Sequence, residues 1–265
     1  MPFFIAAPYI FGASVSGSLH LQEGLPCQDA YCYELVSDDF GVIAVADGLG
    51  SAPFSDLGSR LSVDAAVCAA KSLLLGTSSD KLDLSEIPVR MLQAARECLE
   101  ETALIEDFQL GDMATTLIAV LFNSHCIYTA QIGDGAVVAQ VAGSLVLLSG
   151  PVHSEYANEV TPITCNTWQA NLSRAEACSG AEYLAVFTDG CQRASLRKTV
   201  EGYEPFERFF HPVFSYAAGM DNIEKGELEL SEFLASEKIS EYSEDDKTLV
   251  LAVLHGQCDN RTDSL

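Results

Sequence analysis

The sequence predicts an α+β protein in which antiparallel β-sheets are covered by helices. Two observations support this fold class: the predicted strands come in clusters, and the predicted helices come in pairs between those clusters. A parallel sheet would instead alternate single strands with single helices. The 265 residues contain no repeat, low-complexity tract or linker, and 48% of them are hydrophobic. We therefore expect one domain, residues 1–265, with a sizeable core.

Short apolar runs that are rich in β-branched residues and bounded by Gly, Asp or Ser predict the strands. We expect strands at residues 9–16, 30–37, 40–47, 113–122, 125–132, 136–141, 144–149, 182–188 and 248–254. The apolar start of the chain, from Met1 to Phe11, has no basic residue and is interrupted by prolines. It is therefore interpreted as leading into the first strand rather than as a signal peptide.

Apolar residues at helical spacing predict helices at residues 54–75, 84–108, 204–218 and 222–238. Residues 150–180 show no clear period and contain two prolines, so we expect an irregular excursion there. This stretch, which includes His153 to Asn158, is either a flap that shapes substrate entry or a plain surface loop. The polar residues 255–265 are expected to form a frayed tail.

Three of the predicted strands lead into an aspartate followed by a glycine. These pairs are Asp47-Gly48, Asp134-Gly135 and Asp189-Gly190, and Asp245 precedes the last strand. Each delivers a carboxylate where a strand leaves the core, and such carboxylates repel one another unless a cation lies among them. Oxygen ligands suit Mg²⁺ or Mn²⁺. Asp-Gly is also common in turns, so the alternative is a purely structural β-sandwich in which these pairs form turns and bind no metal.

The charge of the chain limits its partners. It has 38 acidic and 14 basic residues, which give a net charge of −24. Binding to nucleic acid or to an anionic membrane surface depends on Lys and Arg, so we expect neither partner. No apolar run reaches the roughly 18 residues that a membrane span needs. Most of the acidity is expected to serve solubility, and part of it to form the cation site.

Nine cysteines are scattered along the chain without a C-x-x-C pair. Isolated cysteines of this kind are typical of small buried side chains in a reducing compartment. We therefore expect neither a zinc site nor a disulfide framework, and we expect the protein in the cytoplasm.

In their order along the chain, these motifs resemble the metal-dependent protein phosphatase family, also called protein phosphatase 2C. The matching segments are Ser18-Leu19-His20, Gly24 to Ala30, Asp47-Gly48, Gly133 to Gly135, Thr188 to Gly190 and Asp245 to Thr248. The resemblance extends from about residue 9 to residue 254 and is greatest to compact bacterial members. It implies a four-layer αββα sandwich of two antiparallel sheets flanked by helices, with the metal site at one end.

The resemblance also implies a set of ligands for two Mn²⁺ or Mg²⁺ ions. The matching positions are Asp29, Asp47, Gly48 through its backbone carbonyl, Asp189 and Asp245, with Asp134 as a weaker ligand of a third ion. Two positions depart from the family pattern. Arg193 stands where many members carry another aspartate for the third ion, and the arginine that often holds the substrate phosphate before Asp29 is missing.

His20 is the nearest substitute for the missing arginine. It is expected either to donate to a phosphate oxygen or to act as a general acid. The alternative is a histidine at a strand end whose hydrogen bonds have only a structural role. Arg193 would oppose binding of a third ion, or would contact phosphate instead.

The activity implied by the resemblance is hydrolysis of phosphoserine and phosphothreonine in proteins by a metal-activated water. The expected partners are a phosphorylated protein substrate and a cognate serine/threonine kinase. Two functional alternatives stay open: a pseudophosphatase that binds phosphorylated partners without turnover, and a small-molecule phosphomonoesterase on the same scaffold. Both would keep the predicted fold.

Overall fold

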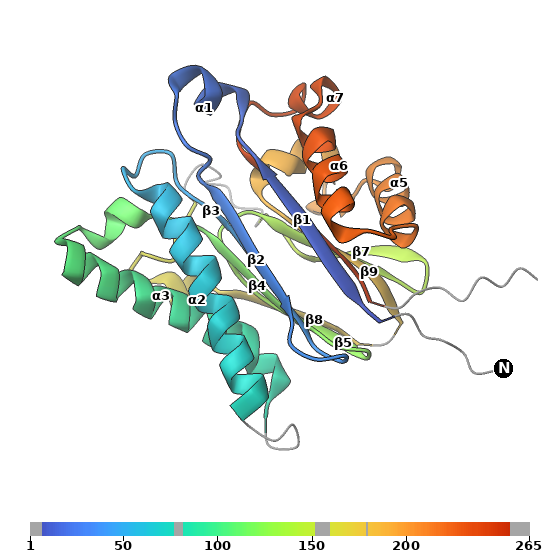
Figure 1. Cartoon of the computed structure of the whole chain (residues 1–265), viewed down its shortest axis with the longest axis horizontal. Helices are drawn as coiled ribbons and strands as arrows, with labels where there is room; N and C mark the ends of the chain where they lie inside the picture. Colours follow the sequence, from blue (N-terminus) through green and yellow to red (C-terminus); the bar gives the residue numbers. More distant parts are fainter. Residues whose placement is uncertain (1–6, 77–81, 152–159, 179, 255–265) are drawn as a thin grey trace, which may run out of the picture.

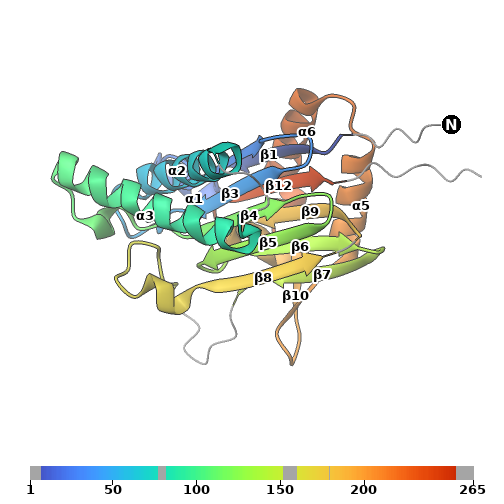
Figure 2. The ribbon, with the colours of Figure 1, turned by 90° about the horizontal axis from the view of Figure 1, so that it is seen from below.

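Two five-stranded sheets face each other in the computed structural model, and helices cover the outer face of each sheet (Figures 1 and 2). The structure describes residues 7–76, 82–151, 160–178 and 180–254. The four layers are those expected from the sequence. The expected tail at 255–265 and the stretch from His153 to Asn158 lie outside the described residues.

All neighbouring strands in both sheets are antiparallel. The first sheet has the order β1 (Tyr9–Val15), β12 (Lys247–Val253), β9 (Ala181–Phe187), β6 (Ala136–Val141) and β7 (Ser144–Ser149). The second has the order β2 (Asp29–Leu35), β3 (Gly41–Asp47), β4 (Leu117–Phe122), β5 (Cys126–Ile132) and β8 (Ser173–Cys178). A separate hairpin pairs β10 (Leu196–Lys198) with β11 (Tyr203–Pro205).

Two long helices, α2 (Ser55–Gly76) and α3 (Ile87–Glu106), pack on the second sheet. The first sheet is covered by α5 (Glu207–Ala218) and α6 (Ile223–Ala235). The shorter helices are α1 (Ser18–Glu23), α4 (Gln192–Ser195) and α7 (Glu237–Ser240). Single 3₁₀ turns are η2 (Leu84–Glu86), η3 (Leu110–Met113), η4 (Trp168–Asn171) and η5 (Asp189–Cys191).

The sandwich buries three hydrophobic clusters, one between each pair of layers, because successive side chains of a strand point to opposite faces. In β3, Val42 and Ala44 contribute to the cluster under α2 and α3, whereas Ile43 and Val45 contribute to the cluster between the sheets. Both faces of such a strand are covered, which explains why the central strands are continuously hydrophobic.

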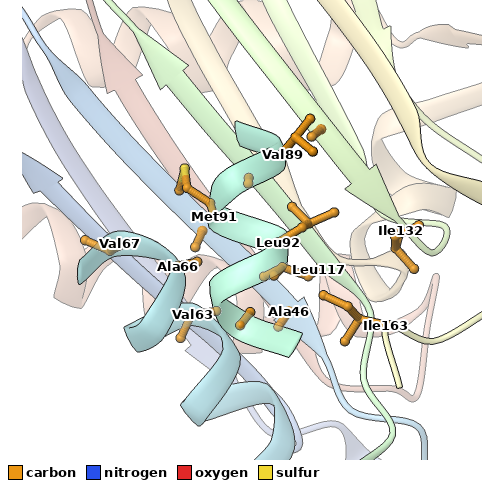
Figure 3. Close-up of a cluster of buried hydrophobic side chains, with 14 of the residues drawn as sticks. Ala46, Val63, Ala66, Val67, Val89, Met91, Leu92, Leu117, Ile132 and Ile163 are labelled. Carbon is orange, nitrogen blue, oxygen red and sulfur yellow. The ribbon is translucent and has the colours of Figure 1, made fainter. Parts of the chain in front are cut away.

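Leu92 of α3 lies in the cluster shown in Figure 3 and is fully buried among residues of α2, α3 and the second sheet. Replacing it by alanine removes packing contacts and leaves a cavity. We expect Leu92→Ala to lower the free energy of unfolding by about 2–5 kcal/mol, measured by urea denaturation. Leu104 of the same helix is 84% exposed. Leu104→Ala is the matched control, and an equal loss in both variants would contradict the packing explanation.

The structure corrects the expected boundaries in several places. Residues 173–178, within the stretch expected to be irregular, form β8. This edge strand alternates half-buried and exposed residues and has no apolar run, so only its pairing with β5 reveals it. The helix expected at 222–238 is divided into α6 and α7 by the extended backbone of Ser236. The short α1, β10 and β11 were not expected.

The expectation that the cysteines form no disulfide is wrong for one pair. Cys126 and Cys178 stand opposite each other on β5 and β8 and are joined by a disulfide. They are 52 residues apart in the sequence, so only the register of the edge strand brings them together. The other cysteines of the described chain carry free thiols. No helix among the described residues combines the length and hydrophobicity of a membrane span.

Candidate metal centre

Strands of both sheets deliver acidic residues to one end of the sandwich. Asp29 begins β2 and stands directly opposite Asp47, the last residue of β3. Asp134 lies in the turn that connects β5 of the second sheet to β6 of the first. Asp189 follows the end of β9, and Asp245 precedes the start of β12, its antiparallel neighbour. Aspartates from five parts of the sequence therefore meet at one end of the sandwich.

A cavity of about 1280 Å³ opens at this end of the molecule. Carboxylates of Asp47, Asp134, Asp189 and Asp245 line it, together with His20. Asp29 does not line the cavity; it is buried, with 7% of its surface exposed, on the strand beside Asp47. The predicted residues thus divide into a cavity-facing group and one buried carboxylate.

Asp47, Asp134 and Asp189 form a close group of carboxylates. One carboxylate oxygen from each lies within 4.8 Å of the others. Threonines fix the backbone of Asp47: its amide donates to Thr116 Oγ1 at 3.0 Å, and Thr115 Oγ1 donates to its carbonyl oxygen at 2.9 Å. These three carboxylates are the residues that would hold a hard divalent cation, for which carboxylate oxygens are the preferred ligands.

Asp29 is held by two hydroxyl groups from the first sheet. Thr188 Oγ1 donates to Asp29 Oδ2 at 2.7 Å, and Thr248 Oγ1 donates to the same oxygen at 2.8 Å. Burial is the main cause that raises the pKa of Asp29 to about 8; the two hydrogen bonds lower this pKa, and the carboxylates of Asp246 and Asp189 contribute smaller increases.

The same electrostatic conflict extends across the cluster. Burial and the neighbouring carboxylates, Asp29 first among them, raise the pKa of Asp47 well above its ordinary value. Burial and the charges of Asp134 and Asp245 raise the pKa of Asp189 to about 6, and burial raises the pKa of Asp134. Carboxylates packed in this way are stable in their charged form only when cations offset their repulsion.

The predicted ligands fit hard divalent cations, because Asp47, Asp134, Asp189 and Asp245 offer carboxylate oxygens at the cavity wall. Gly48, the predicted backbone-carbonyl ligand, lies where only a glycine fits. A Cβ atom at this position would lie 2.7 Å from the carbonyl oxygen of Ser55, so the chain can pass here only as glycine. The backbone hydrogen bonds between this segment and residues 114–116 use the carbonyl oxygen of Asp47 and the amide of Leu49. The carbonyl oxygen of Gly48 takes no part in these bonds, as expected of an oxygen that would bind a cation.

Asp245 and Asp246 are adjacent but have different surroundings. Asp245 is exposed at the cavity wall, and the buried ammonium of Lys247 donates to its carbonyl oxygen at 2.7 Å. Asp246 is buried and accepts from the backbone amides of Gly17 at 2.7 Å and Gln28 at 2.6 Å. Asp246 therefore connects the α1 segment and the loop before β2 to the start of β12.

His20, on α1, is positioned by Asp246. Its Nδ1 atom lies 2.9 Å from Asp246 Oδ2, an ion-pair distance when the ring is protonated, although the two groups are not aligned for a hydrogen bond. Only 8% of His20 is exposed, and its exposed part lines the cavity. The Nε2 atom is thus the nitrogen left for a group bound in the cavity.

Arg193 and Lys198 bring positive charge to the same cavity. Both side chains are exposed, and both line it, from α4 and β10. The neighbouring Gln192 donates from its Nε2 atom to the carbonyl oxygen of Asp134, which ties α4 to the turn that carries this carboxylate. The guanidinium of Arg193 therefore belongs to the cavity wall, where it can meet an anion.

An oxygen-lined cavity at the end of an αββα sandwich places the chain in the class of enzymes that work through divalent cations. The family model of protein phosphatase 2C matches residues 16–235. Serine/threonine-protein phosphatase 3 of Escherichia coli (strain K12) is 31% identical over 248 residues, which cover 91% of this chain and 96% of that protein. The chain belongs to the protein phosphatase 2C family.

Solved structures agree with this fold. The serine/threonine phosphatase Stp1 from Staphylococcus aureus superposes with a TM-score of 0.61 at 13% identity, covering 94% of this chain and 95% of that one. The catalytic domain of the phosphatase PstP, solved with two manganese ions, superposes with a TM-score of 0.57 at 15% identity, covering 93% and 97%. Identities this low show the fold alone. Family membership confirms the predicted activity class, a metal-dependent protein phosphatase.

Some residues that shape the site were not predicted as such. Thr188 and Thr248 were part of the recognised motifs, but their bonds to Asp29 join two sheets and appear only in the folded chain. Thr115 and Thr116 fall in the strand expected at 113–122, but β4 begins at Leu117, and both threonines hold the backbone of Asp47. The side chain of Asp246 has no local signal beyond its motif, because its partners come from the other end of the sequence.

Proposed function

We propose that this chain hydrolyses phosphoserine and phosphothreonine esters in proteins with two bound Mn²⁺ or Mg²⁺ ions. The ligands would be Asp29, Asp47, Gly48, Asp189 and Asp245, directly or through water, with Asp134 as a weaker ligand of a third ion. The observation that carries this proposal is the convergence of carboxylates from both sheets on one cavity, where burial and mutual repulsion raise the pKa values of Asp47 and Asp189. The alternative to Asp29 as a direct ligand is a buried support for Asp47.

Cations bound at these oxygens supply an activated water as nucleophile and offset charge on the phosphoryl group. The residues of the chain do the rest. Thr115 and Thr116 fix the backbone of Asp47, and Thr188 and Thr248 hold the carboxylate of Asp29, so both residues are positioned before any ion binds. No protein nucleophile is required in this scheme.

His20 is proposed to protonate the leaving serine or threonine oxygen from its Nε2 atom, while Asp246 keeps the ring oriented. We expect His20→Ala to lower kcat for a phosphothreonine peptide by about 10²–10³-fold. Hydrolysis of p-nitrophenyl phosphate should change little, because its leaving group needs no proton. Equal losses on both substrates would instead assign His20 to phosphate binding, and unchanged kcat and KM on both would remove it from the site.

Arg193 is proposed to contact the substrate phosphate in place of the missing arginine. We expect Arg193→Ala to raise KM for both substrates about tenfold or more, with a smaller effect on kcat, because a charge-assisted hydrogen bond is lost. Arg90, exposed on α3 away from the cavity, provides the control variant Arg90→Ala. If Arg193→Ala instead lowered KM and bound one more Mn²⁺ in calorimetry, its main role would be to exclude a third ion.

The deciding experiment is a Mn²⁺ and Mg²⁺ titration of p-nitrophenyl phosphate and phosphothreonine-peptide hydrolysis, with EDTA as the control. Turnover that requires metal and favours the peptide supports the proposal. Preference for small phosphomonoesters would assign the site to a small-molecule phosphatase. Metal binding in calorimetry without turnover on either substrate would assign it to a phosphate-binding pseudophosphatase.

Four further expectations accompany this proposal. The chain acts as one catalytic domain, since both sheets contribute ligands. A serine/threonine kinase that phosphorylates the same substrates is its functional counterpart. The protein is expected to act in the cytoplasm because six cysteines of the described chain carry free thiols, although the disulfide between Cys126 and Cys178 is unusual in that compartment. Within the stretch 150–180, the described segment that begins at Val160 borders substrate entry, because Val160 lines the cavity; Arg96 holds this segment by donating to the carbonyl oxygens of Ile163 and Cys165.

A further inference from the structure

A second cavity lies beside the first, in the helical layer over the sheet that begins with β1. We propose that it is a substrate-docking site that takes an apolar side chain next to an acidic residue, both from the segment that flanks the phosphorylated residue. This inference rests on the proposed function, because it extends the substrate contacts of the same enzyme. It adds a preference for apolar-acidic sequences that the metal centre alone does not create.

The second cavity has a volume of about 750 Å³ and is walled by α4, α5, α6 and α7, which Figure 1 shows in part on the outer side of the β1 sheet. Its walls are mainly apolar and aromatic. The residues that form them include Phe206, Phe209, Val213, Leu230, Phe233 and Ile239. Four of these are buried, so the floor is part of the packed fold, and the space is large enough for a bulky side chain.

The rim of this cavity is positively charged although the protein carries a net charge of −24. Arg208 and Lys238 both line the cavity and are exposed. Neither is in an ion pair with any acidic residue that the structure describes. Glu229, the one acidic lining residue in the described part, is already engaged by the Tyr216 hydroxyl and by Lys225 Nζ at 3.7 Å. The two uncommitted cations complement an acidic ligand.

The two cavities share a wall. Tyr242 lines both of them. On α4, Arg193 faces the metal cavity and its neighbour Ala194 faces the apolar one. Ser240, at the end of α7, lines the metal cavity, whereas Ile239 lines the apolar one. One extended peptide can therefore pass from one cavity to the other across Tyr242.

This continuity favours a substrate segment over a second copy of the chain. A second copy would have to present an apolar side chain beside an acidic one without blocking the metal cavity. A phosphoprotein substrate is already anchored in the metal cavity by its phosphate, so a nearby second contact gains from a high effective concentration. The acidic groups next to the two cations in the sequence, Glu207 and Glu237, do not line the cavity.

The test uses phosphothreonine peptides of one neutral background with a single Phe-Asp pair placed at successive distances on either side of the phosphothreonine. Ala-Ala peptides are the reference. We expect kcat/KM to rise about 10- to 100-fold at one spacing, because a buried Phe contributes that much. Two variants should remove most of this gain in kcat/KM. Val213→Trp fills the cavity, and the double variant Arg208→Glu/Lys238→Glu reverses the charge of the rim. Arg90→Glu is the matched control.

Every variant should keep wild-type hydrolysis of p-nitrophenyl phosphate, which is too small to reach the second cavity. If that activity is present but no spacing improves the peptide, the docking inference is wrong and the proposed function stands. A wild-type sedimentation mass equal to a dimer that becomes a monomer in the rim variant, with no peptide preference, would assign the cavity to a second copy. If no substrate turns over, anisotropy of labelled peptides decides: preference for Phe-Asp supports docking, and equal binding overturns it.

Discussion

Asp47→Asn should abolish phosphatase turnover and at the same time make the metal-free protein more stable. Turnover should fall by at least about 10²–10³-fold, because the central carboxylate of the cluster loses the charge that holds cations. Stability should rise because the substitution removes one charge from a site where Asp29, Asp189 and Asp245 repel it. We expect the melting temperature in EDTA to rise by roughly 2–4 °C, which is about 1 kcal/mol for a chain of this size.

The control for this variant is Asp38→Asn, which removes the same charge from an exposed loop. It should change neither turnover nor melting temperature beyond about 0.5 kcal/mol. Added Mn²⁺ should raise the melting temperatures of the wild type and of Asp38→Asn. It should raise the melting temperature of Asp47→Asn by a much smaller amount. Full activity in Asp47→Asn would refute its role as a ligand. Loss of activity together with lower stability in EDTA would show that Asp47 supports the fold rather than the cations.

The stability of the metal-free protein should increase as the pH falls. In the folded state the pKa is about 8 for Asp29 and about 6 for Asp189, both above the ordinary value of 3.8. The folded state therefore binds these protons more tightly than the unfolded chain does. Their stabilising effect is complete below about pH 4 and is lost as the pH rises through about 6 and then about 8. In EDTA, the melting temperature should thus be higher near pH 5.5 than near pH 8.5.

Saturating Mg²⁺ should reverse this trend, because the cation competes with the protons for the same oxygens. The gain in melting temperature on adding Mg²⁺ should grow as the pH rises from about 6 to about 8.5. Scanning calorimetry in EDTA and in Mg²⁺ measures both the melting temperature of the metal-free protein and its increase when Mg²⁺ is bound. Asp29→Asn is the diagnostic variant and should flatten the part of the EDTA curve near pH 8. If the wild-type melting temperature in EDTA were highest near pH 8.5, repulsion between the clustered carboxylates would not be what limits the stability of the metal-free protein.

The central strands and the long helices follow closely from the sequence. A strand such as β3 is covered on both faces, so its residues are all hydrophobic and its ends are marked by glycine and aspartate. The helices α2 and α3 carry apolar positions at helical spacing because each packs on a sheet. Elements that pack little, such as the edge strand β8 and the hairpin β10–β11, leave no such pattern and were missed.

The sequence alone determined that several aspartates stand at the ends of buried strands, because a carboxylate that ends such a strand must emerge at an end of the sheet. What each residue does there was decided by the tertiary structure. Asp29 is buried because threonines of the opposite sheet enclose it, whereas Asp245 stays exposed. Asp246, the disulfide between β5 and β8, and the apolar cavity under Arg208 and Lys238 all depend on contacts between distant segments. Local patterns record burial and chain direction, but they do not record which distant side chains become neighbours.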